Sequence, residues 1–231
     1  MKTLIIGLGN FGSTLAKELT KMGHEVIGVD KDKHKVDLYA NEITYTMALD
    51  TSDRHALNSL PLDDIDLAVV AIGEDFGSSM LTSALLQERK INNLYCRAIT
   101  DLHKEILESL GIHNVLFPEQ MSAEHFARSV IHKHVIDYYQ ISDAVEILKL
   151  YAPPKYLGLT LGNIRFSKEY NIQVLSVMKP REKKKLFKAA INEYTDVPFT
   201  DDTVIDEKDC LILCGSQNNI EKFIKRELDS W

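Results

Sequence analysis

The feature that most constrains this chain is a regular alternation of short apolar runs and amphipathic stretches over residues 1–118. A helix between two strands returns the chain to the edge where a parallel neighbour can start. The alternation therefore predicts an α/β fold with a doubly wound parallel sheet. We expect strands at 3–6, 26–29, 43–49, 67–72, 94–98 and 115–117, and helices at 11–22, 33–41, 52–60, 76–89 and 101–110.

The alternation stops after residue 118, and a single long helical pattern follows over residues 119–139. An element of this kind can link two domains or cross to a partner subunit. The rest of the chain contains runs of strand-like segments and few helical ones, which predicts a small α+β domain. Its expected elements are strands at 145–150, 173–178 and 210–214, helices at 160–170 and 217–228, and a basic turn at 179–188. The predicted parts are a first domain at 1–118, a crossover helix at 119–140 and a second domain at 141–231.

Composition excludes several classes of protein. The 231 residues are 45% hydrophobic and 26% charged, as in ordinary folded soluble proteins. The longest uninterrupted apolar run, at 67–72, is far shorter than the ~20 residues of a membrane span, so no direct membrane insertion is expected. A net charge of −7 argues against a nucleic-acid partner. Three cysteines at no metal-like spacing predict a reduced, cytoplasmic protein.

A glycine motif, Gly7-Leu8-Gly9-Asn10-Phe11-Gly12, joins the first predicted strand to the first predicted helix. Gly7 permits a tight turn, Gly9 lets the backbone approach a pyrophosphate, and Gly12 lets the helix pack on the strand. The helix N-terminus offers free N–H groups to phosphates. Asp30, at the end of the second strand, can accept hydrogen bonds from ribose hydroxyls. This context predicts a Rossmann-like dinucleotide site; the alternative is a glycine-rich turn that binds nothing.

Other polar residues follow later strands, and ligands of such sheets bind outside the carboxyl ends of the strands. Asp50 ends the third strand, where a base would lie, although it can equally cap the next helix. Glu74 and Asp75 follow the fourth strand and are interpreted as solvated loop acids. Arg97 ends the fifth strand and is expected to face the same crevice.

Groups for catalysis are missing from the expected crevice. A dehydrogenase needs an acid, base or carbonyl anchor beside the nicotinamide. His125, His132 and His134 fall on the long helix, where a surface or interface position is expected, and His24 and His113 precede strands as structural residues. We therefore expect a site that holds a nucleotide without transforming it, and no enzyme activity. A small NAD-dependent oxidoreductase is the alternative.

The succession of motifs resembles the RCK family, the regulators of conductance of K⁺ found in Trk and Ktr potassium-uptake systems. The glycine motif, Asp30, Leu49-Asp50, residues 71–75 and Phe117-Pro118-Glu119 resemble the RCK N-terminal (TrkA-N) domain, and residues 157–159, 164–165 and 170–174 the C-terminal (TrkA-C) domain. The resemblance covers nearly the whole chain. It implies a cytosolic gating subunit: homodimers assembled into an octameric ring, docked at the inner face of the cell membrane on a membrane-embedded potassium transporter subunit.

The resemblance also implies NAD(H), ADP or ATP as ligand of the first domain. Gly7, Gly9, Gly12, Asp30 and Asp50 match nucleotide positions of the family, and Asn10, Phe11, Lys31, Ile72, Gly73 and Arg97 complete the expected set. Asn10 stands where members that use ATP often carry arginine, which favours NAD(H) or ADP because a γ-phosphate would be less well neutralised. Glu119 matches an acid that holds a divalent cation in some members; the alternative is an acid that favours a helix N-terminus.

In the second domain, Arg165 and Asn171 fall at positions that resemble those binding cyclic di-AMP in some members, with apolar Ile172 beside them. Arginine suits a phosphate, and an apolar wall suits a purine face. The alternatives are a solvated helix residue for Arg165 and a helix-ending cap for Asn171. The basic turn at 181–185 is suited to anionic lipid or an acidic transporter loop, with a solvated hairpin as the alternative.

Overall fold

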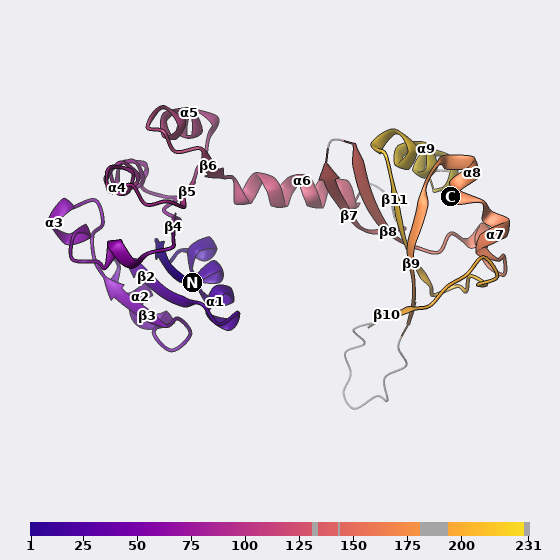
Figure 1. Ribbon diagram of the computed structural model, residues 1–231, viewed down its shortest axis with the longest axis horizontal. Coiled ribbons are helices and arrows are strands. Elements are labelled where there is room, and N and C mark those ends of the chain that lie inside the picture. The colour runs from indigo at the N-terminus through magenta and orange to yellow at the C-terminus, as the bar shows by residue number, and fades with distance from the viewer. Residues whose placement is uncertain (131–133, 143, 181–193, 229–231) are drawn as a thin grey trace. The chain divides into compact units, whose positions relative to one another are not determined.

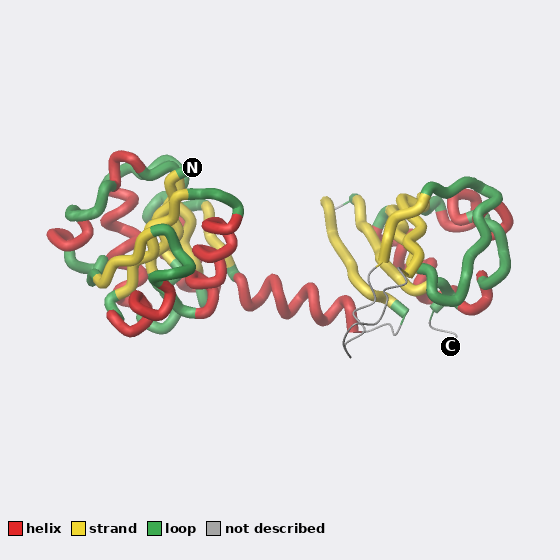
Figure 2. Tube along the Cα trace, turned by 90° about the horizontal axis from the view of Figure 1, so that it is seen from below, coloured by secondary structure: helices red, strands yellow, loops and turns green. Residues whose placement is uncertain are grey.

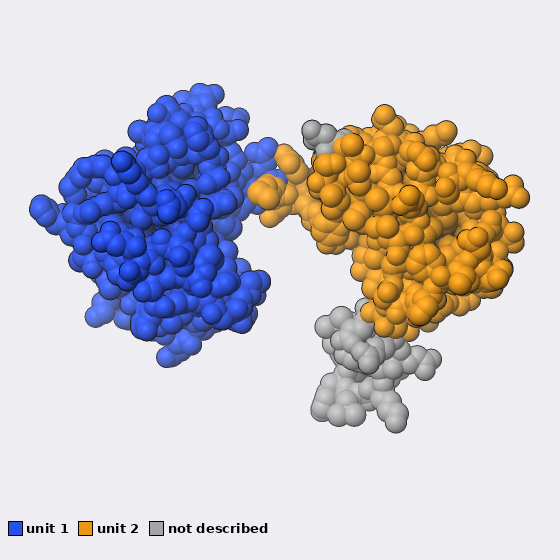
Figure 3. Space-filling model, viewed as in Figure 1, with its two compact units in different colours: residues 1–120 blue, residues 121–231 orange. Residues whose placement is uncertain are grey.

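The computed structural model describes residues 1–130, 134–142, 144–180 and 194–228 (Figure 1). The chain divides into two compact units, Met1–Gln120 and Met121–Trp231 (Figure 3). Each unit has its own sheet and its own hydrophobic core. None of the helices within these ranges combines the length and the apolar character that a bilayer crossing requires.

Unit 1 contains a six-stranded sheet in which every strand pair is parallel, with the order β3-β2-β1-β4-β5-β6. The strands are β1 (Lys2–Ile6), β2 (Glu25–Asp30), β3 (Tyr45–Ala48), β4 (Leu67–Val70), β5 (Leu94–Arg97) and β6 (Asn114–Leu116). The helices are α1 (Asn10–Lys21), α2 (Lys33–Tyr39), α3 (Arg54–Leu57), α4 (Phe76–Glu88) and α5 (Asp101–Ser109), with a 3-10 turn at Leu62–Asp64. The predicted doubly wound sheet is confirmed. The strand order reverses between β1 and β4, which is where such sheets bind ligands.

The central strands of this sheet are buried on both faces. Leu4 and Ile6 of β1 contribute to one core and Ile5 to the other, as the alternation of side chains along a strand requires. Helices lie on both sides of the strands (Figure 2). This double burial explains why β1 and β4 are continuous apolar runs rather than alternating patterns.

The helix α6 (Pro118–Val130) begins in unit 1 and ends in unit 2. The helix predicted over 119–139 is wrong from Val135 on, because residues Val135–Ser142 form the strand β7, and residues 131–133 lie outside the described residues. This segment is rich in β-branched and aromatic residues, and it pairs with β8 (Val145–Tyr151) as an antiparallel hairpin. Strand pairing overrides the helical periodicity there. His125 lies on α6, His134 directly precedes β7, and His132 lies outside the described residues.

Unit 2 contains a five-stranded antiparallel sheet with the order β10-β9-β11-β8-β7. Its other strands are β9 (Gln173–Pro180), β10 (Tyr194–Val197) and β11 (Cys210–Gly215), and its helices are α7 (Leu161–Ile164), α8 (Phe166–Tyr170) and α9 (Gln217–Glu227), with a 3-10 turn at Pro154–Tyr156. The small α+β domain is confirmed, although β10 was not predicted. Strand β9 extends into the predicted basic turn, and residues 181–188 of that turn lie outside the described residues.

The closing helix α9 anchors the core of unit 2. Phe223 is fully buried and packs against the rings of Phe166 and Tyr170, with centroids 5.8 and 5.3 Å away. One turn later, the buried carboxylate of Glu227 accepts hydrogen bonds from the hydroxyls of Tyr156 and Tyr170. A buried charge is tolerated only when it is paired in this way. Helix α9 thus holds α8 through both an apolar and a polar contact.

We predict that Phe223→Ala lowers the free energy of unfolding of unit 2 by about 3–5 kcal/mol, since a large aromatic side chain leaves a cavity among α8, α9 and the sheet. Urea denaturation with hydrogen exchange followed on β11 peptides measures it. The neighbouring exposed residue provides the control: Lys222→Ala should change the same quantity by less than about 0.5 kcal/mol. Equal effects of the two variants would contradict the assignment of Phe223 to the core.

Candidate functional site

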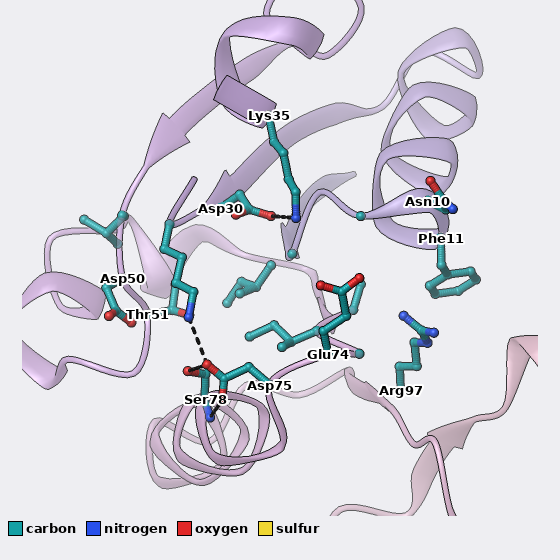
Figure 4. Close-up of a pocket in the computed structure, with 18 of the residues that line it drawn as sticks. Asn10, Phe11, Asp30, Lys35, Asp50, Thr51, Glu74, Asp75, Ser78 and Arg97 are labelled. Carbon is teal, nitrogen blue, oxygen red and sulfur yellow. Dashed lines mark hydrogen bonds and ion pairs between the residues drawn. The ribbon is translucent and has the colours of Figure 1, made fainter. Parts of the chain in front are cut away.

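A pocket of about 330 Å³ lies at the carboxyl ends of the strands in unit 1 (Figure 4). Its lining comes from the loops after β1, β2, β3 and β4, from the last residue of β5 and from the first turn of α6. Every residue predicted for the first domain lines it except Gly12, which packs behind it. The lining also includes residues that the sequence did not single out as ligands: Lys35, Leu49, Thr51, Glu74, Asp75 and Ser78. The structure thus brings the predicted set together, and its binding role stays a prediction.

The glycine loop between β1 and α1 has the geometry of a phosphate cradle. Gly7 has a φ of +95°, a conformation that favours glycine, and its N–H donates to the Val29 carbonyl oxygen at 2.7 Å. A Cβ on Gly12 would lie 1.9 Å from the Gly7 carbonyl oxygen. A Cβ on Gly9 would meet nothing within 4 Å, so the backbone there is open to a close-lying ligand. The predicted turn at Gly7 and close packing at Gly12 are confirmed.

The carboxylate of Asp30 ties the end of β2 to this loop. The Leu8 N–H donates to its Oδ2 at 2.7 Å, and the Asp32 N–H donates to its Oδ1 at 2.8 Å. The Nζ of Lys35 lies 3.9 Å from Oδ2 (Figure 4). An ionised carboxylate has about four acceptor positions, so these backbone contacts leave acceptor capacity for ligand hydroxyls.

Asp50 lies in the lining after β3 and is not the cap of the following helix. Its Oδ1 accepts from the Ser52 N–H at 3.0 Å and from the Ser52 hydroxyl at 2.6 Å. The N-cap of α3 is Asp53, whose Oδ1 accepts from the His55 and Ala56 N–H groups. The capping alternative for Asp50 is therefore wrong. The helix predicted over 52–60 is present only at Arg54–Leu57, because the Asp53 carboxylate caps its start.

Asp75, which we interpreted as a solvated loop acid, is the N-cap of α4. It accepts from the Ser78 N–H at 2.9 Å, and it forms an ion pair with Lys31 at 2.9 Å. The Lys31 ammonium, and to a smaller extent the Ser78 N–H, hold the pKa of the Asp75 carboxyl well below its usual value. The interpretation failed because Lys31 follows β2, far away in the sequence, and only the sheet order brings it to the start of α4.

Arg97 is the last residue of β5, and its side chain is 17% exposed. The expectation that it faces the crevice is confirmed, since it lines the pocket. Its guanidinium lies directly over Gly73, where a Cβ would come within 2.3 Å of Nη1. A side chain at position 73 would therefore displace the Arg97 guanidinium from its place in the pocket.

Glu119, the residue predicted to hold a divalent cation, lies in the first turn of α6 and pairs with Arg97. Its Oε1 accepts from Arg97 Nη2 at 2.5 Å. Within the ranges that the structure describes, no group of three or more histidine, cysteine, aspartate or glutamate side chains is arranged to hold a metal ion. The alternative for Glu119, an acid at a helix N-terminus, fits its position.

Of the three residues proposed for a ligand in unit 2, two are exposed and one is buried. Arg165 and Asn171 are exposed and left-handed, with φ of +57° and +53°, and each ends a short helix. Arg165 therefore breaks the helix predicted over 160–170, and Asn171 is the helix-ending cap that the alternative described. Ile172 is fully buried in the core of unit 2, so its side chain offers no wall to a purine.

Comparison with known proteins places the chain in a family. The model of the TrkA-N domain matches residues 3–118. The chain belongs to the TrkA-N family. It is 30% identical to the Ktr system potassium uptake protein C of Bacillus subtilis over 224 residues. This alignment covers 97% of this chain and 96% of that protein. It is 31% identical to the Ktr system potassium uptake protein A of the same species, covering 95% of this chain and 93% of that protein.

Solved structures share the fold of this TrkA-N protein. The GsuK RCK domain superposes with a TM-score of 0.64 at 15% identity, covering 95% of this chain and 46% of that one. The GsuK channel bound to NAD gives a TM-score of 0.63 at 14% identity, covering 96% of this chain and 38% of that one. The resemblance to the RCK family and the predicted fold class are confirmed.

We predict that Gly12→Ala lowers the free energy of unfolding of unit 1 by about 1–3 kcal/mol, because the new methyl group overlaps the Gly7 carbonyl oxygen. Hydrogen exchange on β1 peptides during urea denaturation measures this loss. Gly77→Ala is the matched control: it lies on α4, where an added Cβ meets only Asp75 Oδ1 at 3.6 Å. In the Gly77→Ala variant, the free energy of unfolding of unit 1 should rise by up to about 1 kcal/mol. A Gly12→Ala protein of unchanged stability would contradict the described packing.

Proposed function

We propose that this TrkA-N protein is the nucleotide-binding regulatory subunit of a Ktr-type potassium uptake system. The observation that carries the proposal is its 30–31% identity to two Ktr system proteins over nearly the whole length of each. The pocket in unit 1 supplies a site through which a ligand can act. Control of transport then follows from binding alone, without a chemical step.

The pocket geometry supports a nucleotide with ribose and phosphate groups. Phosphates are placed at the N-terminus of α1, where the cap residue Gly9 provides no side-chain hydrogen bond and the first N–H groups are free to bind an anion. Ribose hydroxyls are placed at Asp30, whose negative charge disfavours a 2′-phosphate. The base of the nucleotide would lie near Asp50. NAD(H) or ADP are the preferred ligands, with ATP less favoured because Asn10 carries no charge; the NAD-bound GsuK channel shares the fold.

The second candidate function is a small NAD-dependent oxidoreductase, which the Rossmann-like fold alone would permit. The composition of the pocket favours regulation instead. Its lining, all of it within the described residues, contains carboxylates, lysines and an arginine but no histidine, cysteine or tyrosine. Histidine, the side chain that most often acts as general acid or base, is therefore missing from this lining. Oxidation of NADH by this protein with an added carbonyl compound would reverse this preference.

The proposed assembly is a homodimer that forms an octameric ring on a membrane-embedded potassium transporter subunit, in the cytoplasm at the inner face of the membrane. A ligand shifts such an assembly only by binding one of its shapes more tightly than the other. A tenfold preference corresponds to about 1.4 kcal/mol per site. Several coupled sites would therefore add up to a decisive bias.

We predict that Asp30→Ala weakens binding of ADP and NAD⁺ by about tenfold, since hydrogen bonds from the ribose to a charged acceptor are lost. Isothermal titration calorimetry measures the affinities. Asp37→Ala, which removes an exposed acid from the adjacent helix α2, is the control and should bind as the original protein does. Unchanged affinity in Asp30→Ala would remove the ribose assignment.

A thermal-shift panel tests which ligand the protein prefers, because each compound raises the melting temperature only if it binds the folded state. The panel compares NAD⁺, NADH, ADP and ATP, with and without Mg²⁺. Cyclic di-AMP is included because Arg165 and Asn171 are exposed in unit 2. We expect NAD(H) or ADP to give the largest shift. The absence of a shift with every nucleotide would overturn the proposed function.

We predict a particle mass near eight times 26.2 kDa for the purified protein, measured by light scattering after gel filtration. A tagged chain should also co-purify with a potassium-transporter membrane subunit from detergent-solubilised membranes. A monomer under all nucleotide conditions would contradict the proposed ring.

A further inference from the structure

The cations of the pocket are all engaged in ion pairs. Five acids and three cations line it, and each cation is paired with one of the acids. The pairs are Lys31 with Asp75, Lys35 with Asp30, and Arg97 with Glu119. In this acidic lining, a phosphate gains a cationic partner beside the N–H groups of α1 only where a cation turns from its acid toward the ligand. At least one pair is therefore a competitor of phosphate binding.

The Arg97–Glu119 pair is the one best placed to exchange. In Figure 4 the Arg97 side chain extends toward Phe11 of the glycine loop, whereas Asp75 lies on the other side of the pocket, with Asp50 and Thr51. A phosphate at the N-terminus of α1 therefore lies on the side of Arg97. The Lys35–Asp30 pair lies at the position proposed for the ribose, and its partner Asp30 is also held by backbone N–H groups.

The two partners are held very differently. The Arg97 side chain is 17% exposed and lies over Gly73, while the Glu119 side chain is 63% exposed. The buried Nε of Arg97 has no hydrogen-bond partner among the described residues, and of its guanidinium donors it is Nη2 that bonds to Glu119. An arginine has five N–H donors and binds phosphate oxygens in pairs. The guanidinium is thus built into the pocket, and the acid is the replaceable partner.

We propose that Glu119, acting through Arg97, determines how strongly the affinity of the pocket depends on the phosphate charge of its ligand. This inference rests on the proposed function, since it requires a nucleotide in the pocket. Glu119 and a ligand phosphate compete for the same guanidinium. Glu119 is a positioning residue that lowers the affinity for di- and triphosphates and leaves the affinity for an uncharged nucleoside unaffected.

The exchange also connects the ligand to α6. Glu119 belongs to the first turn of α6, and Arg97 belongs to the end of β5, so their bond fastens the start of that helix to the sheet. A phosphate that takes over Arg97 releases this bond. Helix α6 continues into unit 2, so the release alters a contact of the segment that joins the two units.

The experiment is calorimetric titration of ADP, AMP and adenosine into four full-length proteins: the original chain, Glu119→Gln, Arg97→Gln and the double variant. Glu119→Gln should bind ADP about threefold more tightly, the scale expected from breaking an exposed ion pair, with adenosine unchanged. Arg97→Gln should bind ADP about tenfold more weakly, again with adenosine unchanged. The double variant should behave as Arg97→Gln does, because Glu119 acts only through Arg97.

Glu105→Gln, which removes an exposed acid of α5 outside the pocket, controls for the loss of one negative charge and should leave all affinities unchanged. If the original chain binds ADP and Glu119→Gln leaves the ratio of ADP to adenosine affinity unchanged, the inference fails while the proposed function stands. It fails equally if Glu119→Gln tightens ADP binding in the Arg97→Gln background. If the original chain binds no nucleotide, both are overturned. Because Glu119 is largely exposed, its single variant decides the inference even where an Arg97 variant folds poorly.

Discussion

The close contact between Gly12 and the carbonyl oxygen of Gly7 is the constraint on which the site depends. It allows the first turn of α1 to lie against the end of β1 and beside Ala71, at the point where the strand order reverses. No residue with a Cβ can take that place without moving the backbone. The N-terminus of α1 and the carboxylate of Asp30 thereby line the same pocket, which is the basis for the proposed phosphate and ribose positions.

The electrostatics of this pocket suit a sensor better than a catalyst. Its three cations are each paired with an acid, and in the proposed exchange a ligand phosphate replaces Glu119 as the partner of Arg97. Such an exchange changes contacts between elements, and in the Arg97–Glu119 pair the element affected is the helix that leaves unit 1. The relation to Ktr system proteins and the pocket chemistry thus lead to the same interpretation. The site binds its ligand without transforming it, and binding regulates potassium transport.

Prediction from the sequence was most accurate where local pattern and tertiary structure demand the same thing. The strands and helices of unit 1 could be located because buried parallel strands are apolar runs and their crossovers are helices. In unit 2 the pattern was less informative. Residues 135–139 fall within the predicted helix, yet pairing with β8 makes them part of a strand. The helix expected over 160–170 is interrupted at Arg165, whose left-handed backbone turns the chain so that Phe166 and Tyr170 reach Phe223.

By itself, the sequence determined the spacing of the three glycines, the acid at the end of β2 and the alternation that builds the sheet, because each of these acts through neighbours along the chain. Only the tertiary structure decided that Lys31 pairs with Asp75, 44 residues away, that Arg97 pairs with Glu119, 22 residues away, and that Ile172 is inside a core instead of at a surface. These outcomes depend on which strands become neighbours in the sheet and on how far each side chain reaches. The order of residues along the chain specifies neither of them.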